Sequence, residues 1–195
     1  MDEKPKKKLF PILIALMVLI TAAVVISGIF YLKNDKESNE EKTGIDMKTI
    51  SFDSIPQICM EIPIDYSPFK DDYVKEFYRS GTASVIVTAE ESALSLDEYI
   101  MKAIEDYKGV SDEFEISDTR DVTVDNKAMA NVTEFNYHIK GMDSSSLTAF
   151  VVFIRHDNMV YIITCTAPVD EYATRKPEFE AILDSIWFRG TVTAE

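Results

Sequence analysis

LTAFVVFIRHDNMVYIITCT, residues 147–166, is the stretch that decides the fold of this chain. Two apolar runs, 147–156 and 159–166, flank Asp157-Asn158, and both residue types of that pair tolerate the left-handed backbone of a two-residue turn. A strand that faces water on one side alternates apolar and polar residues, whereas these two runs are apolar on both faces. We therefore predict two long antiparallel strands in the middle of a sheet, with further structure covering each face.

Other segments with strand character surround this pair. They are rich in β-branched and aromatic residues and are bounded by turn residues, which is typical of strands. Two of their junctions, Ser80-Gly81 and Asp125-Asn126, are predicted to be tight turns. The segments are residues 48–52, 57–62, 73–80, 82–90, 114–124 and 127–140.

The clearest helix begins at Ser95. The sequence Ser95-Leu96-Asp97-Glu98 is a capping box, in which the serine hydroxyl and the glutamate carboxylate accept hydrogen bonds from each other's backbone amides. An apolar stripe at helical spacing follows as far as Tyr107, and we expect Gly109 to act as the C-cap. This helix supplies the cover for one face of the sheet.

A second helical region follows the central strands. Residues 170–176 are predicted to form a short helical turn, and Pro177 suits the first position of a separate helical segment that runs to Ile186. Trp187-Phe188 is then expected to return to the sheet as a short final strand. The predicted fold is α+β, an antiparallel sheet with helices on both faces.

The order of these elements resembles the PsbP-like superfamily over about residues 47–189. That family includes an extrinsic photosystem II subunit, bacterial envelope proteins of the DcrB and LpqN types, and a Ran-binding nuclear import factor. The resemblance implies an α/β/α sandwich and a binding or accessory role at a membrane, and it brings no catalytic motif with it. The segments that carry it are Glu61-Ile62-Pro63 with Tyr66, the helix of residues 95–107, YIITCTAP at 161–168, and residues 179–188.

The apolar segment Leu9–Leu32 has 24 residues and no charge. As a helix it would be about 36 Å long, enough to cross a hydrocarbon core of roughly 30 Å. Lysines dominate residues 1–8, which predicts a cytoplasmic N-terminus, a single-pass anchor in the cell membrane and an extracytoplasmic remainder. The alternative is a signal peptide cleaved after Ser27, but the apolar run before that site is longer than the usual ~7–15 residues.

The remainder divides into a polar tether at 33–46, a folded domain at 47–190 and a short tail at 191–195. Beyond residue 32 the chain has 16 basic and 32 acidic residues. A surface of that sign repels nucleic acid and anionic lipid, so both are poor partners for the domain, and we expect no nucleic-acid partner. It suits a soluble domain that meets a protein partner at the outer face of the membrane.

Two cysteines, Cys59 and Cys165, lie in predicted strands. A disulfide between them is allowed outside the cytoplasm, and two buried free thiols are the alternative. With only two cysteines and two histidines, and without paired metal-ligand spacing, the sequence predicts no structural zinc site.

The densest acidic cluster consists of Asp112, Glu113, Glu115 and Asp118. Carboxylate oxygens are the ligands that Ca²⁺ prefers, so these residues are the candidate metal ligands, although their spacing does not match an EF-hand loop. The alternative is a solvated acidic face. No other cofactor is indicated, because the six glycines form no phosphate-binding loop.

Residues that suggest catalysis are sparse. Ser144-Ser145-Ser146 lies in a predicted turn and His156 beside another, and no sequence feature brings the two together. The sequence therefore favours an anchored binding or accessory module over an enzyme. Two alternatives stay open: a cation-dependent envelope enzyme, and a structural subunit of a membrane complex that makes its contact through the anchor helix.

Overall fold

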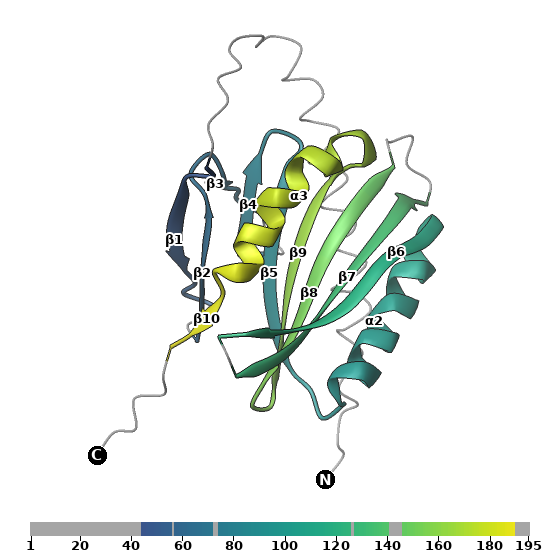
Figure 1. The fold of residues 1–195 in the computed structure, drawn as a ribbon. Helices are drawn as coiled ribbons and strands as arrows, with labels where there is room; N and C mark the ends of the chain where they lie inside the picture. The colour runs from purple at the N-terminus through teal and green to yellow at the C-terminus, as the bar shows by residue number, and fades with distance from the viewer. Residues whose placement is uncertain (1–43, 56, 72–73, 126, 141–145, 190–195) are drawn as a thin grey trace, which may run out of the picture.

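The main sheet of the computed structural model has seven strands in the order β3-β4-β5-β9-β8-β7-β6, and all neighbouring strands are antiparallel (Figure 1). The structure describes residues 44–55, 57–71, 74–125, 127–140 and 146–189. β8 and β9 lie at the centre, which confirms the prediction from residues 147–166. The strands are β3 (Ser67–Pro68), β4 (Glu76–Ser80), β5 (Ala83–Glu91), β6 (Ser111–Val124), β7 (Ala128–Ile139), β8 (Leu147–His156) and β9 (Met159–Pro168).

A smaller sheet has the order β1-β2-β10, with β1 (Met47–Ser51), β2 (Ile58–Pro63) and β10 (Trp187–Phe188). The prediction that Trp187-Phe188 returns to the main sheet is wrong, because Trp187 pairs with Cys59 of β2. The end of the preceding helix explains this: the Glu61 amide of β2 donates to Ser185 Oγ at 2.8 Å, which brings the chain to the edge of β2.

The two helices pack on opposite faces of the main sheet (Figure 1). α2 (Leu96–Val110) shares one core with the β7, β8 and β9 side chains that point its way. α3 (Val169–Asp184) shares the other core with β2 and the opposite side of the main sheet. The predicted α+β architecture with helices on both faces is confirmed, and the small sheet beside α3 is an addition to it.

The start of α2 is the predicted capping box. The Glu98 amide donates to Ser95 Oγ at 3.3 Å, and the Ser95 amide donates to the Glu98 carboxylate at 2.9 Å. The prediction that Gly109 caps the other end is wrong, because the helix continues to Val110 and Ser111 is its C-cap. Side chains satisfy the last carbonyls instead: Ser111 Oγ donates to Tyr107 O at 2.7 Å and Lys140 Nζ to Gly109 O at 3.0 Å.

α3 is one continuous helix with Pro177 in its interior, so the predicted break at Pro177 is wrong. Proline lacks the amide hydrogen of an interior helical bond, which destabilises a helix. Here the helix is held by tertiary packing on both sides of the proline, since Tyr172 and the fully buried Phe179 both contact the same core. That packing outweighs the destabilising effect of proline within a helix.

The predicted tight turns are confirmed at three positions with left-handed backbone. Gly81 has a φ of 55°, Asp125 of 52° and Asp157 of 55°. The predicted anchor, Leu9–Leu32, lies outside the described residues. Neither of the two helices within those residues is long and apolar enough to span a bilayer.

Candidate functional site

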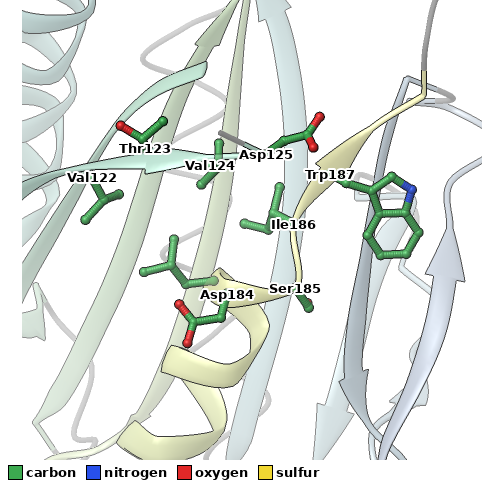
Figure 2. A pocket seen from close by; sticks show the side chains of 9 residues that line it. Val122, Thr123, Val124, Asp125, Asp184, Ser185, Ile186 and Trp187 are labelled. Carbon is green, nitrogen blue, oxygen red and sulfur yellow. The ribbon is translucent and has the colours of Figure 1, made fainter. Parts of the chain in front are cut away.

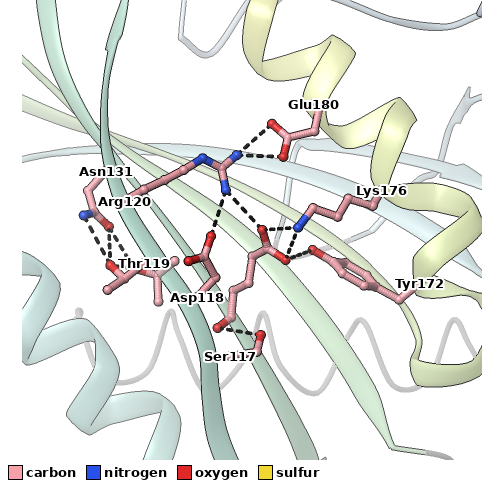
Figure 3. Close-up of polar contacts among 10 residues, drawn as sticks. Ser117, Asp118, Thr119, Arg120, Asn131, Tyr172, Lys176 and Glu180 are labelled. Atoms are coloured by element: carbon pink, nitrogen blue, oxygen red, sulfur yellow. Dashed lines mark hydrogen bonds and ion pairs between the residues drawn. The ribbon is translucent and has the colours of Figure 1, made fainter.

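A charged cluster joins α3 to the main sheet. Glu134 occupies a position on β7 whose side chain points toward α3, as do those of Ala130 and Val132 on the same strand. Lys176 Nζ contacts both carboxylate oxygens of Glu134, at 2.7 and 2.9 Å, and the Tyr172 hydroxyl donates to Oε2 at 2.7 Å. We call this the Glu134 cluster (Figure 3); its members are Asp118, Arg120, Glu134, Tyr172, Lys176 and Glu180.

Arg120 is the second cation of the Glu134 cluster. Its Nη1 donates to Glu134 Oε1 at 3.1 Å, and its Nη2 lies 2.7 Å from each carboxylate oxygen of Glu180. Burial by itself raises the pKa of Glu134, but hydrogen bonds from Lys176 and Tyr172 outweigh it and hold that pKa below its ordinary value. The cluster is therefore charged and internally paired at neutral pH, which is typical of a structural tie.

A second polar group holds the other side of α3. The Tyr66 hydroxyl donates to Glu178 Oε2 at 3.0 Å, and Arg175 Nη1 donates to Glu178 Oε1 at 3.0 Å. Burial raises the pKa of Tyr66, and the Glu178 charge adds to that rise. Tyr66 is part of the family resemblance, and its role in the structure is to fix α3 against the loop that follows β2.

A pocket of about 400 Å³ lies where the C-terminal end of α3 meets the end of β6 and the start of β10 (Figure 2). Its apolar wall comes from Val122 and Val124 of β6 and from Ile186. Two carboxylates also line it, Asp125 and Asp184, and Figure 2 shows them at opposite ends of the pocket. Leu183, Ser185, Thr123 and Trp187 complete the lining.

The polar groups of this pocket suit binding. Ser185 Oγ donates to Ile182 O at 2.7 Å and accepts from the Glu61 amide. Both hydrogen bonds are to the backbone, so the hydroxyl has a structural role and is not placed as a catalytic nucleophile. Asp125 Oδ2 accepts from the Phe188 amide at 3.3 Å. Two carboxylates and the negative end of a helix dipole make the pocket electronegative, and Val122, Val124 and Ile186 give it a smaller apolar part. It suits an apolar group that carries a positive charge.

The predicted metal ligands Asp112, Glu113, Glu115 and Asp118 all lie on β6 and are exposed. β6 is irregular in this stretch, with left-handed backbone at Glu113 and register shifts against β7 between Asp112 and Glu115 and between Ile116 and Asp118. Asp118 instead pairs with Arg120 Nη1 at 3.1 Å. Within the described part of the chain, no three His, Cys, Asp or Glu side chains are grouped to hold a metal ion.

Cys59 and Cys165 are both buried free thiols, on β2 and β9 of different sheets. Burial raises the pKa of Cys165, and the nearby Glu178 raises it further. Of the predicted serine group, Ser144 and Ser145 lie outside the described residues. Ser146 precedes β8 and His156 ends it, so a ten-residue strand separates them.

Sequence reasoning missed the Glu134 cluster and the pocket. The available signal was Glu134 itself, which follows Ala128, Ala130 and Val132 at alternate positions and so places a carboxylate on a core-facing side of β7. The partners on α3 lie about 40 residues further along the chain. Their pairing depends on how α3 crosses the sheet, which no local pattern encodes.

Solved structures of similar fold include cyanobacterial PsbP (CyanoP) from Synechocystis sp. PCC 6803, with a TM-score of 0.54, 10% identity and coverage of 78% of this chain and 98% of that one. The domain has a PsbP-like fold. The Ran-binding protein Mog1p of Saccharomyces cerevisiae has a TM-score of 0.52 and 14% identity over 74% of this chain and 96% of its own. LpqN of Mycobacterium tuberculosis, involved in cell envelope biogenesis, has a TM-score of 0.52 and 13% identity over 75% of this chain and 92% of its own.

At these identities the likeness establishes the fold, and it confirms the resemblance to the PsbP-like superfamily found in the sequence. No family model matches the chain, and no curated protein is significantly similar to it in sequence. The function therefore has to be argued from the site, because one fold serves many functions.

Proposed function

We propose that the protein is an accessory module, anchored in the cell membrane, that binds a protein partner on the extracytoplasmic side. The observation that carries this proposal is the pocket at the end of α3, where the Ser185 hydroxyl is hydrogen-bonded to backbone and the ionisable groups in the lining are the carboxylates of Asp125 and Asp184. Neighbours of the same fold, one of them Ran-binding and one an envelope protein, support a binding role.

Leu9–Leu32 supplies the anchor in this proposal. Its length suits a bilayer crossing, and the lysines before it favour a cytoplasmic N-terminus. The polar tether of residues 33–46 then joins the anchor to β1, which begins at Met47. This arrangement holds the domain within a few nanometres of the outer surface of the membrane.

The partner side chain that fits the pocket has an apolar stem and a positive end, as lysine and arginine do. Val122, Val124 and Ile186 accept the stem, and Asp125 or Asp184 accepts the charge. The acidic balance of the domain steers such a partner toward it.

The test places a photocrosslinking amino acid at Val122, which is partly exposed and lines the pocket, in the full-length membrane protein. We expect a crosslinked partner that is lost in the double variant Asp125→Asn, Asp184→Asn and retained in Glu115→Gln, an exposed carboxylate elsewhere on β6. Asparagine suits the left-handed backbone at position 125, so the fold is preserved. An unchanged crosslink in the double variant would refute the proposed site.

A second arm replaces Leu9–Leu32 with an unrelated transmembrane helix. If the domain makes the contact, the crosslink at Val122 persists. If the crosslink disappears while the hybrid still reaches the membrane, the anchor helix makes the contact, and the protein is a structural subunit.

A further inference from the structure

β6 is an edge strand whose outer side is open to solvent. It is the last strand in the order of the main sheet, so β7 is its one strand neighbour among the described residues (Figure 1). All of its residues from Asp112 to Thr123 are exposed or partly exposed. In an antiparallel pair, the N–H and C=O groups of alternate residues point away from the neighbouring strand. The outer side of β6 therefore presents backbone donors and acceptors to solvent.

The two halves of this edge differ in regularity. The first half is irregular, because Glu113 has left-handed backbone with a φ of 53° and the register against β7 shifts twice before residue 118. Irregularities of this kind protect an edge from pairing with a further strand. Residues 118–124, by contrast, pair one for one with residues 134–128 of β7. We call residues 118–124 the regular edge, and its geometry is that of a strand able to accept another.

The regular edge runs along the pocket at the end of α3. Val122 and Val124 line that pocket, and Figure 2 shows β6 passing along one side of it. Both side chains point to the α3 side of the sheet, since Val124 belongs to the core shared with α3 and Val122 packs against that core. Cross-strand partners point to the same side, about 5 Å apart. A strand added opposite Val122 therefore directs a side chain toward the pocket.

The charge of the regular edge decides which kind of strand it accepts. Asp118 and Asp121 are exposed, and Asp121 Oδ1 accepts a hydrogen bond from the neutral amide of Asn131 at 2.8 Å, which leaves its charge in place. The cation of this stretch, Arg120, is bound by carboxylates of the Glu134 cluster. Like charges on directly opposite residues destabilise a strand pair, which disfavours a second copy of β6. A basic strand is complementary.

We propose that the regular edge binds an extended basic segment of the partner protein by strand addition, and that a lysine or arginine of this segment enters the pocket. This inference rests on the proposed function and specifies how the partner binds. Main-chain hydrogen bonds supply affinity in strand addition, and pockets for alternate side chains supply specificity. Residues 118–124 extend over about 24 Å as an antiparallel strand, so the bound segment has about seven residues.

Both sides of the added strand meet acidic groups. Side chains on the side of Val122 approach Asp125 and Asp184, the two carboxylates that line the pocket. Side chains on the other side approach Asp121, whose position next to Val122 directs it to the opposite side of the sheet. A segment with cations at every second residue places all of them on one side, where they meet one of these two acidic groups.

The test measures hydrogen–deuterium exchange of the full-length protein in nonionic detergent. The probe is a synthetic peptide of about eight residues in which lysine and threonine alternate, long enough to cover the regular edge. We expect the outward-facing amides of residues 118–124 to exchange at least about tenfold more slowly when the peptide is bound. A peptide in which lysine and proline alternate has the same charge but lacks half of the amide donors, and it should leave exchange unchanged.

Two matched controls separate strand addition from general attraction to an acidic protein. β1 is also an edge strand, at the end of the order β1-β2-β10, and its charged residue is Lys48, so its exchange should not change. Asp121→Lys and Glu115→Lys make the same change of charge at exposed positions of β6. Asp121→Lys should abolish most of the slowing, whereas Glu115→Lys, in the irregular half, should retain it.

Three results would overturn strand addition. The first is unchanged exchange at residues 118–124 with the lysine–threonine peptide. The second is equal slowing by the lysine–threonine and lysine–proline peptides, which would assign the binding to charge alone. The third is slowing that increases with protein concentration in the absence of peptide, which would assign the regular edge to a second copy.

The crosslinking experiment at Val122 distinguishes this inference from the proposed function. A partner that crosslinks at Val122, combined with an edge that the peptide does not protect, retains the proposed function and contradicts strand addition. An edge that the peptide protects, combined with no crosslinked partner in the membrane, retains strand addition and contradicts the accessory role.

Discussion

Lys176 Nζ lies 2.7 Å from Glu134 Oε1, and this contact ties the middle of α3 to the face of β7. Arg120 brings β6 to the same carboxylate and continues to Glu180 on the next turn of α3. One carboxylate that is nearly inaccessible to water therefore connects three elements, and its ionisation contributes to the stability of the domain.

Glu134→Gln is expected to destabilise the domain by about 1–3 kcal/mol, the range for a buried charged partner that is lost. Glutamine keeps the shape but removes the negative charge that pairs with Lys176, while Arg120 retains Glu180 and Asp118. Urea unfolding at pH 7 measures the difference. Glu115→Gln on exposed β6 is the matched control and should change the free energy of unfolding by less than about 0.5 kcal/mol.

The difference in unfolding free energy between wild type and Glu134→Gln depends on pH, and the direction of that dependence follows from the pKa of Glu134. Because the pKa of Glu134 is lowered in the folded state, its stabilisation is present above the ordinary glutamate pKa of about 4.3 and is lost as the pH falls through the folded value. The stability gap between wild type and Glu134→Gln should therefore narrow when unfolding is measured below about pH 4. A stability difference that grows as the pH falls would contradict a lowered pKa of Glu134 in the folded state.

Ser95→Ala removes the N-cap hydroxyl of α2 and should lower the free energy of unfolding by about 1 kcal/mol. Ser95→Thr retains a hydroxyl that can accept from the Glu98 amide and should remain close to wild type. Thermal unfolding followed by circular dichroism compares the two. Equal losses in both variants would show that the cap hydroxyl does not act as described.

Pro177→Ala is expected to stabilise the protein by about 1–2 kcal/mol, since alanine restores the missing interior hydrogen bond while giving back less than about 1 kcal/mol in unfolded-state entropy. The side chain of Pro177 is exposed, so the change leaves the core packing intact. Chemical denaturation provides the measurement. A destabilised Pro177→Ala would mean that the proline sets the course of α3.

Phe179→Ala should cost about 3–5 kcal/mol, because the ring is fully buried and its removal leaves a cavity between α3 and β8. The ring lies 6.1 Å from that of Phe150 and 6.0 Å from that of Tyr172. Met129→Ala, at an exposed side chain, is the control for the loss of apolar volume. Comparable losses in the two variants would place Phe179 outside the core.

The two cysteines should react with Ellman's reagent only after unfolding. Cys59 and Cys165 are both buried, and burial raises the pKa of Cys165 and so removes its reactive thiolate at neutral pH. If Cys59 and Cys165 form no disulfide, both thiols react with Ellman's reagent in urea without reductant. A count of zero under those conditions would reveal a disulfide.

Features that depend on neighbouring residues were predictable from the sequence. The capping box at Ser95 and the left-handed turns at Asp125 and Asp157 are set by side chains within a few positions of one another. The central place of β8 and β9 followed from their apolar character on both faces, which is a consequence of burial.

Features that depend on distant contacts were not predictable. Proline usually interrupts a helix, but packing around Phe179 keeps α3 continuous through Pro177. Gly109 does not end α2, because Ser111 and Lys140 hydrogen-bond to the last carbonyls of that helix. The four carboxylates from Asp112 to Asp118 are close in the sequence, but no three His, Cys, Asp or Glu side chains of the described residues are grouped to hold a metal ion. The Glu134 cluster requires residues about 40 positions apart.

The pairing of β10 with β2 has a consequence for how the domain is completed during synthesis. β1 and β2 are among the first elements of the domain to leave the ribosome, yet the strand that pairs with the free edge of β2, Trp187–Phe188, comes near the end of the described chain. Contacts between such distant parts of a chain form late, because closing a long loop is entropically unfavourable. The edge of β2 in the β1–β2 hairpin therefore stays unpaired until nearly the whole domain has been synthesised. This unpaired edge is where the domain is most prone to pair wrongly with another nascent chain.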